Sequence, residues 1–111
     1  MHNAHIASCK EKYMKTDNLL DKIRFVLNAA KNKTDDDTTL SVIMSLTAEH
    51  SEERNLGKFM GYSVSDYAIA SLKWMDTEKS NQLFKEEYNK LSDDRKTVIG
   101  WLIPNNYHLE M

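Results

Sequence analysis

The sequence predicts an all-α fold: a compact single domain built as a bundle of five or six short helices. Two observations support this prediction. The 111 residues include only three Gly and one Pro, too few for the many turns of a β fold. Apolar residues also recur at helical spacing in several segments that open with helix-capping residues. A chain of this length fits one domain, and we expect flexible ends at residues 1–5 and 105–111.

The first strong helix is expected in the segment TDNLLDKIRFVLNAAKNK, residues 16–33. Thr16 and Asp17 are capping residues at its start. Its apolar members share one helical stripe, and they are Leu19, Ile23, Val26, Leu27 and Ala30. A weaker helix over residues 4–15 precedes or extends it.

Two further helices are expected in the middle of the chain. The segment LSVIMSLTAEH follows Asp37 and Thr38, either of which can cap it. We interpret this segment as a helix, because a lone strand would have no partner. The next helix is expected to start at Ser51, where two glutamates in the first turn complement the helix dipole. Leu56, Phe59 and Met60 form its apolar side.

The last two predicted helices lie near the carboxyl end. Asp76 and Thr77 cap the first of them. Its apolar stripe consists of Leu83, Phe84, Tyr88 and Leu91. Ser92, followed by two aspartates, starts the final helix, and Pro104 ends it. We expect Trp101 of this helix to fill the core, as large aromatic side chains commonly do in a small domain.

Residues 54–74 have the spacing of two helices that cross steeply through a short turn. Gly57 allows a second helix to cross closely, and Gly61 suits a turn with positive φ. The pattern, LGKFMGYSVSDYAIASL, resembles the helix–turn–helix family of phage repressors and related bacterial regulators. A weaker resemblance covers residues 83–103, where LFKEEYNKLSDDRKTVIGWLI looks like the helix pair that often follows such motifs.

The resemblance implies a small DNA-binding transcriptional regulator of phage or mobile-element type that acts as a homodimer. Its second helix would begin near Val64 and enter the major groove. The residues expected to meet DNA are Arg54, Lys58, Ser63, Val64, Ser65, Ala68, Ile69 and Lys73. The three basic residues among them would hold the phosphate backbone. The others include no Arg, Lys, Asn or Gln, the side chains that read base edges best.

Formal charge is unevenly distributed along the chain, whose net charge is −2. Residues 1–33 have a net charge of +4 and residues 54–75 a net charge of +2, which favours a nucleic-acid partner. Residues 34–53 hold six acids and no Lys or Arg, which interrupts any continuous basic surface.

Two alternatives to DNA binding remain open. The helices of residues 54–74 can both be ordinary core helices, because Val64, Tyr67, Ala68 and Ile69 are apolar or small. The chain can also be a non-enzymatic protein-binding module, such as an inhibitor, an immunity-type partner or an anti-host factor. Such a module would use an apolar helix face together with the acidic stretch of the preceding residues.

The sequence predicts no enzyme, no catalytic residue, no metal and no cofactor. His2, His5 and Cys9 have helical spacing, but a metal site needs about four ligands. No glycine-rich phosphate loop or nucleophile signature is present. The single cysteine cannot form an internal disulfide, which favours the cytoplasm. No apolar run approaches the roughly 18 residues that span a membrane, so no membrane partner is expected.

Overall fold

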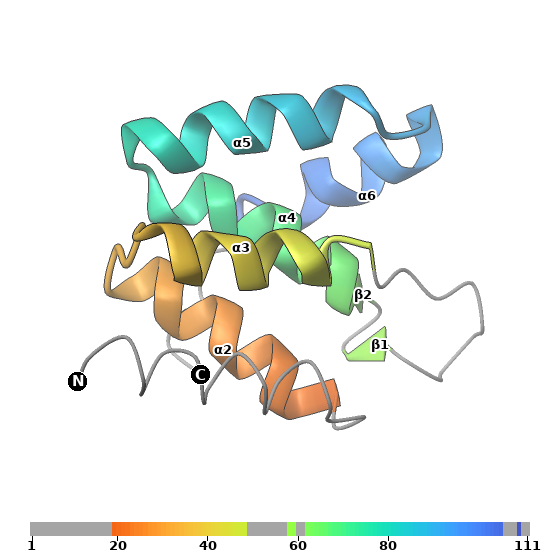
Figure 1. The fold of residues 1–111 in the computed structure, drawn as a ribbon. Helices are drawn as coiled ribbons and strands as arrows, with labels where there is room; N and C mark the ends of the chain where they lie inside the picture. The colour runs from red at the N-terminus through yellow and green to blue at the C-terminus, as the bar shows by residue number, and fades with distance from the viewer. Residues whose placement is uncertain (1–18, 49–57, 60–61, 106–108, 110–111) are drawn as a thin grey trace.

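The computed structural model describes residues 19–48, 58–59, 62–105 and 109, which form five α-helices and one short antiparallel strand pair. In chain order these elements are α2 (Leu19–Lys31), α3 (Asp37–Leu46), β1 (Lys58–Phe59), β2 (Tyr62–Ser63), α4 (Val64–Met75), α5 (Glu78–Asn89) and α6 (Asp93–Leu102) (Figure 1). The prediction of an all-α domain is confirmed. Among the described helices, none combines the length and the apolar character needed to cross a membrane.

Helix α4 lies at the centre of the bundle. It packs against α2, α3, α5 and α6 (Figure 1). Ten of its twelve residues are buried, and the side chains of Tyr67, Leu72 and Met75 are fully enclosed. Burying a large apolar side chain contributes roughly 1.5–3 kcal/mol to the free energy of unfolding. The contacts of α4 are therefore the main source of stability in this domain.

The outer helices bring apolar stripes to α4. In α2, the predicted stripe is confirmed at Ile23, Val26 and Leu27, all of which are buried. In α3, Ile43 and Leu46 are fully buried. The predicted caps of α2, at residues 16–17, lie outside the described residues. Each outer helix thus turns one side to the core and leaves the other side to solvent, as amphipathic helices do.

Side-chain caps fix the starts of four helices. The capping residues are Asp36, Ser63, Thr77 and Ser92. The caps of α5 and α6 confirm the prediction. Helix α3 is capped by Asp36 instead of the predicted Asp37 or Thr38. Asp36 has an extended backbone, so its carboxylate accepts hydrogen bonds from the backbone N–H of Thr39 at 2.9 Å and from the Thr39 hydroxyl at 2.8 Å.

The carboxyl ends of α2 and α4 are joined by one hydrogen bond. Lys33 and Asp76 follow these helices with left-handed backbones, at φ values of 51° and 54°. This conformation turns the chain sharply after each helix. The Lys33 Nζ donates to the carbonyl oxygen of Met75 at 2.8 Å and so satisfies a group that the helix leaves unpaired.

The helix predicted from Ser51 is wrong where the structure describes it. Lys58–Phe59 is a strand that pairs antiparallel with Tyr62–Ser63. Phe59 and Tyr62 have high strand propensity, and the two residues between the strands include a glycine, a combination typical of a hairpin. Residues 51–57 and 60–61, with both glycines of the predicted turn, lie outside the described residues.

Helix α6 ends before Pro104, as predicted, and Trp101 lies on its outer side. Ile99 and Leu102 are fully buried, whereas Trp101 is 63% exposed, so the prediction of a core tryptophan is wrong. The apolar contacts made by Ile99 and Leu102 fix the orientation of the helix and leave Trp101 on its outer side. In the carboxyl-terminal stretch, the half-buried Leu109 packs against the core.

Candidate functional site

The segment predicted to enter the major groove is part of the core. Ser63, Ser65 and Ala68 are fully buried, and Val64 and Ile69 are 4% and 1% exposed. The predicted exposure of these five residues is therefore wrong. Ten of the twelve residues of α4 are buried and most of them are apolar or small, which is typical of a core helix rather than of a helix presented to a ligand.

Of the three predicted phosphate contacts, only Lys73 has a side chain that the structure describes. Arg54 lies outside the described residues, and Lys58 belongs to β1. Lys73 is exposed on α4, where its Nζ lies 5.7 Å from the centre of the Phe84 ring. That geometry is a cation–π contact, which attaches the lysine to α5. Lys73 is thus exposed on α4, whereas the residues predicted to read base edges are buried.

A buried polar network holds the amino end of α4. The Asp66 Oδ2 accepts the backbone N–H of Ser63 at 3.0 Å, and its Oδ1 accepts Arg95 Nη2 at 3.2 Å. Arg95 Nη2 also donates to the Ser65 hydroxyl at 2.7 Å, and that hydroxyl donates to the carbonyl oxygen of Thr47. The polar side chains at the amino end of α4 therefore join it to α6 and to the residue that follows α3. The Arg95 Nε is buried and has no hydrogen-bond partner among the described residues.

An open groove of about 460 Å³ lies between α3 and α5. Both helices pack on α4 (Figure 1). The residues that line the groove are Asp37, Leu40, Ser41, Met44, Lys79, Gln82 and Leu83. Leu40, Met44 and Leu83 supply apolar surface, and polar side chains border it. An apolar hollow with a polar border is typical of a binding site.

Polar contacts join α3 to α5 near both ends of the two helices. Lys79 Nζ lies 3.5 Å from Asp37 Oδ1 near the start of both helices. The Thr47 hydroxyl donates to Glu87 Oε1 at 3.3 Å just beyond α3. These contacts place the two amino ends together and the two carboxyl ends together, so α3 and α5 run in the same direction along the groove (Figure 1).

The apolar stripe of α5 is only partly covered. The predicted stripe residues Leu83, Phe84, Tyr88 and Leu91 are all half-buried, and Ser80 is the one buried residue of this helix. The Phe84 and Tyr88 rings stack on each other, with centroids 5.4 Å apart. The stripe therefore keeps accessible apolar surface beside the groove, in contrast to α4, of which ten of twelve residues are buried.

The outward side of α3 is almost uncharged. Asp37 in the first turn is the single charged residue of this helix. Beyond it, Ser41 is exposed, and Met44 and Ser45 are half-buried. Removing such small, uncharged groups from water costs less than removing charged side chains, which are depleted at the centres of protein interfaces.

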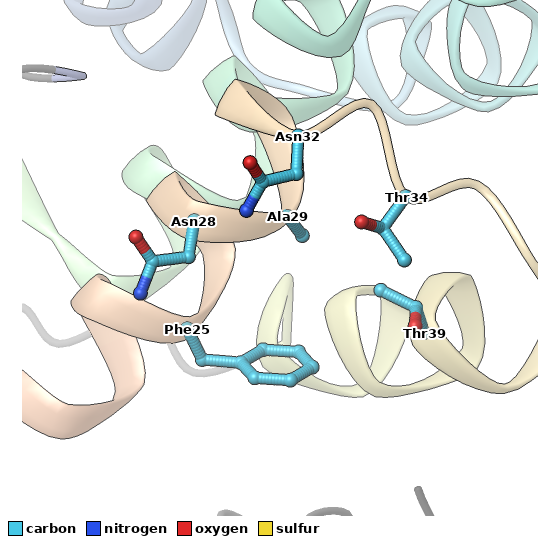
Figure 2. Close-up of a pocket in the computed structure, with 6 residues that line it drawn as sticks. All are labelled: Phe25, Asn28, Ala29, Asn32, Thr34 and Thr39. Carbon is cyan, nitrogen blue, oxygen red and sulfur yellow. The ribbon is translucent and has the colours of Figure 1, made fainter. Parts of the chain in front are cut away.

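A second hollow of about 200 Å³ lies on the other side of α3, beside α2. Its lining residues are Phe25, Asn28, Ala29, Asn32, Thr34 and Thr39. Figure 2 shows the Phe25 ring reaching from α2 toward α3, with the amides of Asn28 and Asn32 on successive turns. The lining residues have no titratable group, so this hollow suits neutral hydrogen-bonding groups rather than acid–base chemistry.

The candidate metal ligands His2, His5 and Cys9 lie outside the described residues. Within the described segments, no three His, Cys, Asp or Glu side chains come together in a way that could hold a metal ion.

The partly covered α5 and the groove beside it were not predicted. The sequence signal for α5, an apolar stripe, is the same whether another helix covers that stripe or not. Comparison with models of known protein families, with curated proteins and with solved structures finds no match for this chain.

Proposed function

We propose that this chain is a non-enzymatic protein-binding module that docks its partner in the groove between α3 and α5. The observation that carries this proposal is the half-exposed apolar stripe of α5 beside an unfilled groove. Apolar surface removed from water contributes roughly 25 cal/mol per Å². A partner that fills the groove would therefore gain binding free energy at Leu40, Met44 and Leu83.

The chemistry of the groove favours a protein over a nucleic acid. Asp37 is the charged residue of α3, and Glu78 opens α5. Carboxylates at these positions repel phosphates, whereas nucleic-acid surfaces need clustered Lys and Arg. The uncharged middle of the groove matches the centre of a protein interface.

The two hollows also support a non-enzymatic role. Nucleophilic catalysis needs a nucleophile within hydrogen-bond distance of a base. Among the described residues, which include none of the four histidines, the Ser41 hydroxyl has no hydrogen bond to a base. The polar hollow beside α2 offers only amides and hydroxyls.

The proposal is tested by changing the centre of the groove. Full-length chain, Met44→Lys and Leu20→Lys are immobilised and exposed to an extract of the source cells. Leu20 is 38% exposed and lies outside the groove, so it provides a control with the same added charge. A partner should be retained by the wild type and by Leu20→Lys and lost by Met44→Lys, while circular dichroism confirms that all three are folded. Identical retention by the three proteins would exclude the groove as the docking site.

A second candidate function is nucleic-acid binding along the exposed side of α2. Arg24, Asn28 and Lys31 are exposed and follow one another at spacings of four and three, so they share one face of the helix. Arg and Lys contact phosphates, and Asn can read a base edge. Residues 1–33 also have a net charge of +4. The homodimer expected of a regulator stays a prediction.

A filter-binding assay at low salt tests this second function. Wild-type chain should retain duplex DNA, and Arg24→Glu combined with Lys31→Glu should lose that retention. The change reverses two exposed charges and leaves the core intact. If folded wild-type protein retains no DNA, this function is excluded.

A further inference from the structure

We infer that the partner segment in the groove between α3 and α5 is an amphipathic helix with basic side chains at the end next to Asp37 and Lys79. This inference rests on the proposed function and adds the conformation and the charge of the partner. It combines three features of the groove: its direction, its floor and the charge at its two ends.

The shape of the groove fits a short helix. Its walls are two helices that run in the same direction, and its lining along α3 runs from Asp37 to Met44. At 1.5 Å per residue this length is about 10 Å, which corresponds to roughly two turns of a bound helix. A third helix can pack its ridge of side chains into such a groove. In the described part of the chain, each strand is only two residues long and offers little edge to an extended peptide.

The floor of the groove selects an apolar stripe on that helix. Leu40 is buried at its base, and Met44 and Leu83 are half-buried along its length. Residues at i, i+3 or i+4, and i+7 of the partner helix would reach these three side chains. Methionine is unbranched and adapts its shape, so Met44 can accommodate different apolar side chains.

Among the described residues, the two ends of the groove differ in charge. Asp37 and Lys79 line its amino-terminal end. The charged residues next to them along the chain are Lys33, Asp35, Asp36, Asp76 and Glu78. These five acids and two lysines have a formal net charge of −3. At the other end, the charged residues of α5 are Lys85, Glu86 and Glu87, followed by Lys90, and their charges cancel. A bound helix is therefore attracted with its basic end toward the amino termini of α3 and α5.

Acids at helix starts are common because they complement the helix dipole, which accounts for Asp37 and Glu78. Asp35 and Asp76 lie outside the helices and add negative charge that capping does not require. The ion pair between Asp37 and Lys79 leaves the two side chains 96% and 59% exposed. Such exposed pairs contribute about 1 kcal/mol or less, so a partner arginine can replace Lys79 at little cost.

The experiment is selection of displayed random peptides of about 16 residues, long enough for the expected helical turns, on the immobilised full chain. Selected peptides are then measured against the wild type, Met44→Lys, and the double variant Asp35→Asn with Asp37→Asn. Asp36 is the cap of α3, so the double variant keeps the start of that helix. The control is Asp93→Asn with Asp94→Asn, which removes two exposed charges at the start of α6.

The selected peptides should carry an apolar helical stripe and Lys or Arg at one end. Their affinity should fall about tenfold or more in Met44→Lys and at least several-fold in the aspartate double variant, and it should not change in the α6 control. A peptide in which Lys and Arg are replaced by Glu should bind weakly to the wild type. It should regain affinity for Asp35→Lys combined with Asp37→Lys.

Two outcomes overturn the inference and are distinguishable. If binding of the selected peptides depends on Met44 but the peptides are extended or lack basic residues, a basic helix is excluded as the partner. The groove then remains the docking site. Peptides that bind Met44→Lys as well as the wild type, or the absence of any selected peptide, exclude the groove itself. Sedimentation of the chain alone provides a third measurement, because self-association that Met44→Lys abolishes would identify a second copy of this chain as the occupant.

Discussion

Asp66 connects α4 to α6 through one carboxylate. Its two oxygens accept hydrogen bonds from the backbone of Ser63 and from Arg95, and Ser63 in turn accepts from the backbone N–H of Asp66 at 3.2 Å. The Asp66 side chain is 5% exposed and that of Arg95 is 23% exposed. A carboxylate at this depth depends on its partners, because water can replace them only in part.

We therefore expect Arg95→Met to lower the free energy of unfolding by about 2–3 kcal/mol, since it leaves the buried Asp66 charge with fewer partners. Urea denaturation with an unchanged m value would measure this loss. Arg24→Met, at an exposed position of α2, is the matched control and should change stability by less than about 0.5 kcal/mol. Equal effects of the two substitutions would show that the network contributes little.

Asp36 gives stability a dependence on acid pH. The Thr39 backbone N–H, which donates to its carboxylate, is the main reason that the pKa of Asp36 lies below its ordinary value of 3.8, while burial opposes the shift. Because the pKa is lower in the folded state, the stabilisation is complete above pH 3.8. It is lost as pH falls through the folded pKa.

The corresponding prediction compares Asp36→Asn with the wild type. Asparagine also caps helices but does not titrate in this range, so the stability advantage of the wild type should shrink as pH falls below about 3.8. Chemical denaturation at a series of pH values measures the difference. A constant difference across that series would contradict the assigned cause. Asp36→Ala removes the cap and should lower the free energy of unfolding by about 1 kcal/mol at neutral pH.

At the scale of the helices, local sequence signals predicted where helices start and which of their sides face inward. They did not predict where each helix lies in the bundle. Capping residues located the starts of α5 and α6 correctly, and apolar stripes identified the inward sides of α2 and α5. These signals are short-range, so a sequence contains them directly. The strand pair at Phe59 and Tyr62 was missed because two-residue strands are too short to show an alternating pattern.

The position of α4 illustrates the limit of periodicity. Its spacing matched a helix that follows a turn, but whether that helix faces solvent depends on the other four described helices. The sequence held one relevant signal: the predicted reading face contains no Arg, Lys, Asn or Gln. A helix with small or apolar residues on every side is typical of a core. The groove between α3 and α5 had no sequence signal, because it depends on how two distant helices are spaced on α4.

A substitution on α4 separates the core interpretation from the DNA-reading one. Ala68 is fully buried, so Ala68→Gln should lower the free energy of unfolding by about 3 kcal/mol or more through overpacking and an unpaired amide. Ser41→Gln, on the exposed side of α3, should change it by less than about 0.5 kcal/mol. If α4 instead reads DNA, Ala68→Gln should leave stability unchanged and strengthen retention of some DNA sequences.

At the scale of the whole molecule, the bundle has a rigid centre and a less firmly held outer layer. Helix α4 is enclosed by four helices, while α5 has Ser80 as its one buried residue and makes its remaining contacts with half-buried side chains. Segments with few buried apolar contacts open at lower free energy than the core. We therefore expect α5, which forms one wall of the groove, to open at lower free energy than α4.

Native-state hydrogen exchange tests this division. Backbone amides of α4 should exchange only through global unfolding, and those of α5 should exchange with a free energy about 1 kcal/mol or more below the global value. A peptide bound in the groove buries the stripe of α5 and should therefore raise the protection of α5 while leaving that of α4 at the global limit. Leu20→Lys, outside the groove, should preserve this gain, and Met44→Lys should remove it. If α5 is already as protected from exchange as α4 in the free chain, the bundle alone holds α5 in place. Binding of a partner then cannot raise the protection of α5 further, and the prediction is wrong.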